Sequence, residues 1–200
     1  MVEPYLQSPT QSSIYILWET DSDSESKVEW GTWPELGEIT FGTAITSYGS
    51  NKLHTVQLTG LHTSRRYFYR VITGSLISEI YNFIMPPDPI SESSFKIVAM
   101  SDMQKDNSNP NKFAEIVHDG ILRYLADQYT GDLPSDLHMV LVPGDLVDNG
   151  LSYSQWANTF FAPAHPLFAH VPVYPVLGNH ESNTGYYFDY FHKCLSPFQL

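Results

Sequence analysis

The stretch HMVLVPGD, residues 138–145, indicates the fold most directly. Its run of consecutive apolar residues is typical of a strand that is covered on both faces of a parallel sheet. The run ends in Pro-Gly-Asp, where proline and glycine favour a sharp turn after the strand. We therefore predict a buried strand over residues 138–142, followed by a loop that begins with Asp145.

The same arrangement occurs on either side of this stretch. FKIVAM, residues 95–100, is a second apolar run, predicted to be a strand covered on both faces. VYPVL, residues 173–177, predicts a third strand despite its internal proline. Asn109-Pro110 is a good helix start, and apolar residues then recur at helical spacing to about Tyr129. With a shorter helix predicted over 152–161, the order of elements indicates an α/β domain with a largely parallel sheet.

The first 85 or so residues follow a different pattern, with short runs of β-branched and aromatic residues separated by turn-forming residues. This pattern predicts a small antiparallel β-sandwich. The proline-rich segment PPDP, residues 86–89, cannot continue a sheet, because proline lacks a backbone donor. We therefore expect two domains, over residues 1–88 and 94–200. The strands expected in the first are residues 13–18, 27–30, 54–58, 65–73 and 77–85.

Composition narrows the class of protein. Hydrophobic residues make up 42% of the chain and charged residues 16%, which is a globular composition. The chain has no apolar run long enough to cross a membrane, and a single cysteine excludes a disulfide framework or a thiolate zinc cluster. The formal net charge of −12 argues against long nucleic acids as partners, since phosphate binding needs a basic surface.

Each predicted strand of the second domain ends in polar residues. Asp102 follows the first strand, Asp145 the second, and Asn179-His180 the third. Because ligands of open α/β sheets bind beyond the carboxyl ends of the strands, we expect these four side chains to converge. Carboxylate and amide oxygens are hard ligands for divalent or trivalent metal ions, and a carboxylate can bridge two of them. The sequence therefore predicts a metal site at this edge of the sheet.

The trio of Asp102, Gly144-Asp145 and GNHE (residues 178–181) resembles the motifs of the calcineurin-like metallophosphoesterases. The glutamate after Asn-His is similar to the purple acid phosphatase branch. The N-terminal segments PYLQ (residues 4–7) and LTGL (residues 58–61) are similar to the fibronectin-III-like domain that precedes such enzymes. The resemblance implies a fibronectin-III-like β-sandwich followed by the first half of a metallophosphoesterase α/β domain.

The resemblance also implies roles for the site residues. Asp145 would bridge two metal ions, Asp102 would bind the first and Asn179 the second. His180 would contact the phosphate or protonate the leaving oxygen. The implied cofactors are two divalent or trivalent ions drawn from Fe, Zn or Mn. The implied reaction is attack of a metal-bound water on a phosphate ester, without a covalent intermediate.

Two features depart from the family pattern. Gln104 stands where a metal-binding histidine is usual, so we expect it either to bind metal through its amide oxygen or to make a loop hydrogen bond. Asp148 stands where purple acid phosphatases have a tyrosine ligand, and we expect it to orient its loop. The residues after Glu181 include His192 but no Gly-His-x-His motif, so we expect a C-terminally truncated protein or an incomplete site.

The expected function is an acid-phosphatase-like hydrolysis of phosphate monoesters. Two alternatives remain open: a phosphodiesterase or nucleotide hydrolase, and a non-catalytic binding or adhesion protein with a degenerate site. The chain alone is expected to be inactive, because the downstream histidines are missing. The β domain implies an extracellular or periplasmic location, although no signal peptide is evident in this chain.

Overall fold

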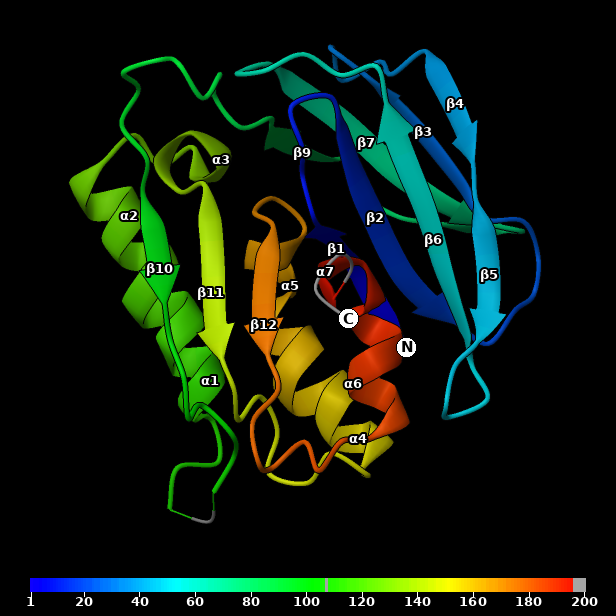
Figure 1. Ribbon diagram of the computed structural model, residues 1–200, viewed down its shortest axis with the longest axis vertical. Coiled ribbons are helices and arrows are strands. Elements are labelled where there is room, and N and C mark those ends of the chain that lie inside the picture. Colours follow the sequence, from blue (N-terminus) through cyan, green and yellow to red (C-terminus); the bar gives the residue numbers. More distant parts are fainter. Residues whose placement is uncertain (107, 196–200) are drawn as a thin grey trace.

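The computed structural model describes residues 1–106 and 108–195. An antiparallel β part and an α/β part lie side by side, with helices of the second part against a sheet of the first (Figure 1). This arrangement confirms the fold class that the sequence predicts. No helix within the described residues is long and apolar enough to cross a membrane.

The β part consists of two facing antiparallel sheets. The first has the strand order β1-β2-β6-β5, and the second has the order β4-β3-β7-β8 with β9 also paired to β7. Alternating side chains such as Tyr67, Tyr69 and Val71 of β7 point into a buried core between the sheets, as their spacing predicts. The strands are β1 (Val2–Gln7), β2 (Ser13–Thr20), β3 (Lys27–Gly31), β4 (Glu38–Phe41), β5 (Thr43–Thr46), β6 (Lys52–Thr59), β7 (Arg66–Thr73), β8 (Leu76–Ile77) and β9 (Tyr81–Ile84).

The prediction of one continuous strand over residues 77–85 is wrong. Ser78 interrupts it, because its main-chain N–H donates to the Val71 carbonyl oxygen (3.0 Å) while its side-chain oxygen accepts from the Val71 N–H (3.0 Å). The segment is therefore divided into β8 and β9. Strands β4 and β5 were not predicted, since their residues are mostly exposed and lack the alternation that marks a half-buried strand.

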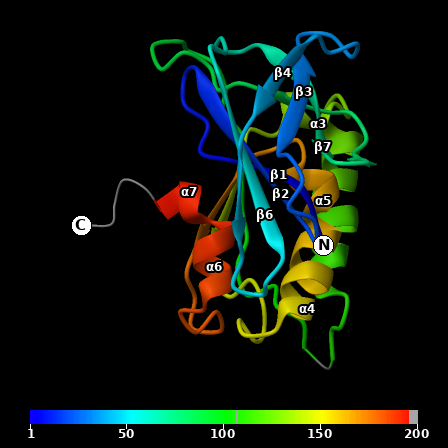
Figure 2. The same ribbon diagram turned by 90° about the vertical axis from the view of Figure 1, so that its right-hand side faces the viewer.

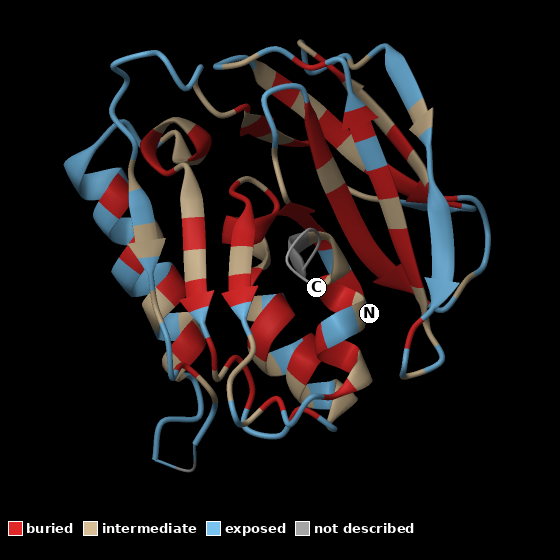
Figure 3. Ribbon diagram, viewed as in Figure 1, coloured by how far each residue is buried: buried red, intermediate tan, exposed pale blue. Residues whose placement is uncertain are grey.

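The α/β part contains a parallel sheet with the order β10-β11-β12. Helices cover one face of this sheet, and strand β10 lies at its edge (Figures 1 and 3). Strand β10 is exposed rather than covered on both faces as predicted, with Ile97 49% exposed. The strands are β10 (Ile97–Ala99), β11 (Met139–Pro143) and β12 (Val173–Val176).

The two predicted helices are present with different bounds, and the helices α3, α6 and α7 were not predicted. The first begins at Lys112, two residues after the predicted Asn109-Pro110 start, because Asn109 instead bonds back to Asp106. The second, predicted over 152–161, continues to Phe168 because its apolar face stays buried through Leu167 and Phe168. The helical elements are α1 (Lys112–Glu115), the π-helical η1 (Ile116–Leu122), α2 (Arg123–Gln128), α3 (Leu133–Asp136), α4 (Tyr153–Gln155), the π-helical η2 (Trp156–Phe161), α5 (Ala162–Phe168), α6 (Gly185–Tyr190) and α7 (His192–Leu195).

A continuous hydrophobic core joins the two parts. Tyr5 and Leu17 of the β1-β2-β6-β5 sheet pack in the same buried cluster as Trp156, Phe161 and Phe191 of the α/β part. Figure 2 shows helix α6 lying along this sheet. The interface also contains polar contacts: the Tyr5 hydroxyl donates to the Tyr190 carbonyl (2.8 Å) and the Tyr69 hydroxyl to the Ala169 carbonyl (2.8 Å). Arg66 of β7 pairs with Asp132 before α3.

Candidate metal site

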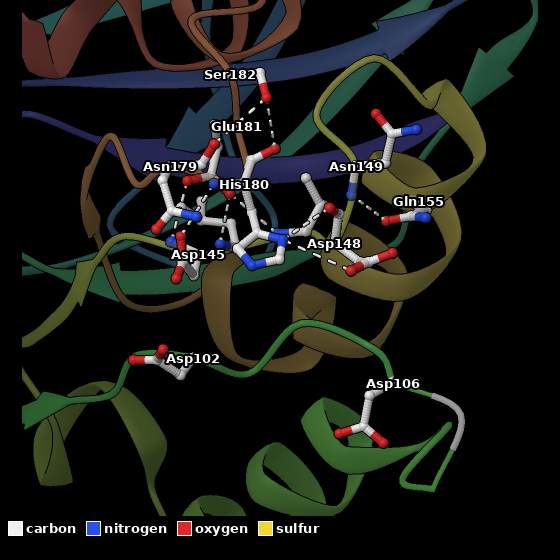
Figure 4. A network of polar contacts seen from close by, with 12 residues as sticks. Asp102, Asp106, Asp145, Asp148, Asn149, Gln155, Asn179, His180, Glu181 and Ser182 are labelled. Atoms are coloured by element: carbon white, nitrogen blue, oxygen red, sulfur yellow. Dashed lines mark hydrogen bonds and ion pairs between the residues drawn. The ribbon is translucent and has the colours of Figure 1, made fainter.

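The carboxyl ends of the three parallel strands place the predicted site residues at one edge of the sheet. Asp102 follows β10, Asp145 follows β11, and Asn179 and His180 follow β12. In Figure 4, Asp145, Asn179 and His180 lie close together, and Asp102 lies across from them on the neighbouring strand end. The Ser101 hydroxyl joins the two groups, because it lies 2.8 Å from the Asp102 Oδ2 and 3.4 Å from the Gly144 carbonyl oxygen.

The two candidate carboxylate ligands have an unusual backbone conformation. Asp102 and Asp145 have φ angles of +56° and +53°, in the left-handed region that non-glycine residues rarely adopt. Such a conformation costs roughly 1–2 kcal/mol for each residue and is concentrated at functional sites. Sequence spacing gives no sign of it, although aspartate tolerates this region better than most residues.

Two glycines let the loops after β11 and β12 come into contact. A Cβ atom on Gly178 would lie 2.2 Å from the Asp145 Oδ1 and 2.3 Å from the Asp145 main-chain nitrogen. A Cβ atom on Gly150 would lie 2.2 Å from the Glu181 carbonyl oxygen. Any larger residue at either position would force the loops apart, so these glycines set the distance between the two strand ends.

Glu181 is fully buried beneath these loops. Its Oε1 accepts the main-chain N–H groups of Leu146 (2.7 Å) and Val147 (3.2 Å), and its Oε2 accepts those of Asp145 (3.0 Å) and Gly178 (2.7 Å). The carboxylate oxygens therefore point at the backbone of the site and not at a ligand. The sequence marked Glu181 only as a family feature, because nothing in one sequence shows that a glutamate in a turn is buried.

His180 lies at the surface of the site. Its Nδ1 lies 2.9 Å from the Asp148 carbonyl oxygen, so the neutral ring carries its proton on Nδ1 and donates there. This bond, with the nearby carboxylates of Asp145 and Asp148, raises the pKa of His180 above its ordinary value. This hydrogen bond at Nδ1 leaves the Nε2 atom available to a ligand. An anion bound nearby would favour the charged form of the His180 ring.

The other polar residues singled out from the sequence have distinct positions. The Gln104 Oε1 is buried and accepts no hydrogen bond from the described residues, so the expected loop hydrogen bond is absent there. Asp148 is exposed, and its main chain orients His180. The Tyr153 hydroxyl donates to Glu19 of the β part (2.9 Å) and points away from the site. The His192 Nδ1 lies 2.7 Å from the Asp189 carbonyl oxygen, outside the cluster.

The donor set fits a cation in part. Asp102, Asp145 and Asn179 offer oxygen ligands at one sheet edge, and the buried Gln104 Oε1 accepts from no donor within the described part of the chain. Across residues 1–106 and 108–195, however, no three His, Cys, Asp or Glu side chains come close enough to hold a metal ion. Asp102 and Asp145 could therefore hold a cation only together with an amide oxygen, such as that of Asn179 or Gln104.

A polar cleft of about 560 Å³ lies beside this edge. Asp148 forms one side of it and Lys105 and Asp106, after β10, form the other. Ser152 and residues of α4 and η2, among them Gln155 and Asn158, also line it. Of the site loops, the cleft is lined by Asp148, whose carbonyl oxygen contacts His180.

Comparison with known proteins gives consistent results. Residues 95–199 match the model of the calcineurin-like phosphoesterase family, and residues 2–85 match the model of the purple acid phosphatase N-terminal domain. A search of curated proteins finds no match.

Among solved structures, a structure of PhoD is similar over 88% of this chain, with a TM-score of 0.56 and 14% sequence identity. The chain spans only 38% of that PhoD chain. The sensor domain of the anti-sigma factor RsgI4 from Pseudobacteroides cellulosolvens is similar over 47% of this chain and 86% of its own length, with a TM-score of 0.32 and 13% identity. The family match extends over the parallel sheet and all the strand-end residues described above, so the chain belongs to the calcineurin-like phosphoesterase family.

Proposed function

We propose that the protein is a metal-dependent phosphoric ester hydrolase of the acid-phosphatase type with a dinuclear centre. One observation carries the proposal: Asp102, Asp145 and Asn179 present oxygen ligands at the carboxyl edge of a parallel sheet in a chain of the calcineurin-like phosphoesterase family. The family generally uses divalent metal ions. Bound ions of this kind polarise phosphoryl oxygens and activate water.

The candidate site residues would have different roles in this reaction. Asp145, which follows the central strand β11, would bridge the two ions, with Asp102 on one side and Asn179 on the other. His180 presents its Nε2 at the surface, where it would donate a proton to the leaving oxygen of the ester. The Asp148 carbonyl accepts from Nδ1 and orients the ring, and donation from Nε2 uses the charged imidazolium, whose pKa this hydrogen bond raises.

The donor set also supports a proposal about the chain by itself. Two ions need more ligands than the four candidate donors supply, and the described residues form no compact acidic or histidine cluster. We therefore expect the 200-residue chain to bind divalent metal weakly and to hydrolyse phosphate esters slowly or not at all. The same observation favours, as a second candidate, a binding protein whose phosphoesterase site has degenerated.

The domain organisation supports a related proposal. The strand orders β1-β2-β6-β5 and β3-β7-β9 correspond to the two sheets of immunoglobulin-like sandwiches, which supports a fibronectin-III-like domain over residues 1–88. The metallophosphoesterase part would then begin at residue 94. An extracellular or periplasmic location is proposed from the resemblance of this β domain alone.

Hydrolysis of two aryl phosphates tests the proposed function. The protein made from its complete reading frame should hydrolyse 4-nitrophenyl phosphate faster than bis(4-nitrophenyl) phosphate, lose activity to a chelator and regain it with Mn²⁺ or Zn²⁺. Asp145→Ala should abolish the reaction, because both ions lose their shared ligand. A faster reaction on the diester would favour the phosphodiesterase alternative. Metal-independent hydrolysis, or none with any ion, would contradict the proposal.

A further inference from the structure

Glu181 is the only residue of the GNHE segment that is buried completely, and the metal chemistry proposed above leaves it without a role. Burial of a charged carboxylate costs several kcal/mol unless hydrogen bonds compensate for the lost water. Here the compensation comes from four main-chain N–H groups at 2.7 to 3.2 Å. Hydrogen bonds to an ionised acceptor are roughly twice as strong as neutral ones, so this arrangement favours one loop geometry.

Three of the four donors are consecutive, from Asp145 to Val147. Successive N–H groups converge on one anion where the backbone combines left-handed and right-handed conformations, an arrangement known as a nest. The left-handed φ of Asp145 is therefore the conformation that turns these N–H groups toward Glu181. The fourth donor, Gly178, belongs to the loop after β12, so a single carboxylate fixes both site loops.

Further contacts connect the same two loops. The His180 N–H donates to the Asp145 Oδ1 (3.3 Å), and the Gly150 N–H donates to the His180 carbonyl (3.0 Å). With Glu181 in place, the Asp145 side chain lies beside Asn179 (Figure 4). Without it, the left-handed conformation of Asp145 would lose its main-chain hydrogen bond to a buried charge.

We propose that Glu181 is a positioning residue for the metal site: its buried carboxylate holds Asp145 in the left-handed conformation and fixes the spacing between Asp145 and Asn179. This inference rests on the metal-dependent function proposed above. Glu181 would touch neither metal nor substrate, because both of its oxygens are occupied by main-chain donors.

The test compares Glu181→Gln with Glu115→Gln in the 200-residue chain. Glutamine keeps the shape of the side chain but places an NH₂ group where an acceptor is needed, so at least one pair of N–H groups loses its partner. Glu115 is exposed on α1, and its substitution removes the same charge from the same domain. Glu181→Asp is a third variant. It keeps the carboxylate on a shorter side chain, and we expect it to disturb folding less than Glu181→Gln does.

Two readouts separate the parts of the proposal. In metal-free protein, hydrogen exchange of the Asp145, Leu146, Val147 and Gly178 amides should quicken at least about tenfold in Glu181→Gln and stay unchanged in Glu115→Gln. Affinity for Mn²⁺, measured from the free-ion signal in electron paramagnetic resonance, should weaken about 10- to 100-fold in Glu181→Gln, as expected for the loss of a supporting contact. Glu181→Asp should fall between that variant and the control.

The outcomes are distinguishable. If the native chain and Glu181→Gln bind Mn²⁺ equally well, the positioning role is wrong and the proposed function stands. If Glu181→Gln does not fold, the same comparison is made with Glu181→Asp. If the native chain binds no Mn²⁺ even at concentrations that fill weak sites, while the four amides respond as expected, the proposed metal site fails and the hold of Glu181 on Asp145 stands. Unchanged exchange at the four amides in a folded variant would overturn the inference directly.

Discussion

Gly178 is one of two glycines at which the two site loops come into close contact. Its missing side chain leaves space for the Asp145 main chain and carboxylate, and its own N–H donates to Glu181. A substitution here would act on the site through geometry alone, without changing any candidate ligand.

We expect Gly178→Ala to destabilise the protein by about 1–3 kcal/mol, since the new methyl group meets main-chain atoms that cannot move aside without breaking the contacts to Glu181. Chemical denaturation measures the change in the free energy of unfolding. Gly120→Ala is the matched control, because the nearest atom to its added Cβ is 3.9 Å away and the residue lies in a helix, where alanine should stabilise by about 0.5–1 kcal/mol. A loss no greater in Gly178→Ala than in the control would contradict this account of the loop contact.

At the same scale, the sequence predicts which site residues come near one another but not how they are held. Asp145 and Asn179 follow apolar runs that are recognisable as strands, so their shared sheet edge could be inferred. The left-handed φ of Asp145 and the burial of Glu181 depend on each other across 36 residues of sequence, and neither has a local signal. Whether Asp102, Asp145, Asn179 and Gln104 bind metal stays a prediction.

Among the elements, strand β2 and helices α4 and α6 meet at one buried carboxylate. Glu19 of β2 accepts hydrogen bonds from the hydroxyls of Tyr153 (2.9 Å), Tyr190 (3.0 Å) and Ser47 (3.1 Å). Burial together with the adjacent Glu19 carboxylate raises the pKa of both tyrosines, so both remain protonated donors throughout the neutral range. Because α4 directly follows the loop of Asp145 to Gly150, this contact ties the site loop to the β-sandwich.

Removal of one of these hydroxyls should cost measurable stability. We expect Tyr153→Phe to lower the free energy of unfolding by about 1.5–3 kcal/mol, the usual contribution of a hydrogen bond to a charged group. Tyr124→Phe is the control, because it also removes a tyrosine hydroxyl but from a side chain of α2 that is 57% exposed. It should change the free energy of unfolding by less than about 0.5 kcal/mol. Urea denaturation of both variants checks this prediction, and equal effects would show that the Glu19 contact contributes nothing.

The order of elements could be predicted because periodicity marks buried faces well. Prediction from periodicity failed where local hydrogen bonds decide the end of an element. Asn109 bonds to Asp106 instead of starting a helix, and Ser78 divides a strand. The prediction that strand β10 is covered on both faces was also wrong, because an apolar run does not show which neighbours the strand will have.

Across the whole molecule, the two parts share one core and a set of buried interfacial groups. His165 of α5 packs edge to face against Tyr81 of β9 at 5.2 Å between ring centroids, and its Nε2 is buried without a hydrogen-bond partner among the described residues. Burial lowers the pKa of His165, an effect that the nearby Glu3 carboxylate opposes only in part. The folded protein therefore favours the neutral ring.

This shift predicts how stability depends on pH. The unfolded chain takes up a proton at His165 near the ordinary pKa of about 6.5, whereas the folded chain resists until a lower pH. The free energy of unfolding should therefore fall as the pH drops below about 6.5. Urea denaturation at about pH 7.5 and about pH 5.5 should show a smaller fall in His165→Leu than in the native protein, while His118→Leu, at an exposed position of η1, should match the native protein. Identical falls in all three proteins would show that His165 does not contribute.

The central claim is that the strand-end residues form a divalent metal site, and paramagnetic broadening by Mn²⁺ tests it most directly because it locates even weak binding. In the native chain, substoichiometric Mn²⁺ should broaden the amide signals of Asp102, Asp145 and Asn179 before all others, and Asp145→Asn should remove this selectivity while Asp119→Asn, an exposed helix position, preserves it. Broadening scattered over other acidic surfaces, or selective broadening that persists in Asp145→Asn, would contradict the claim.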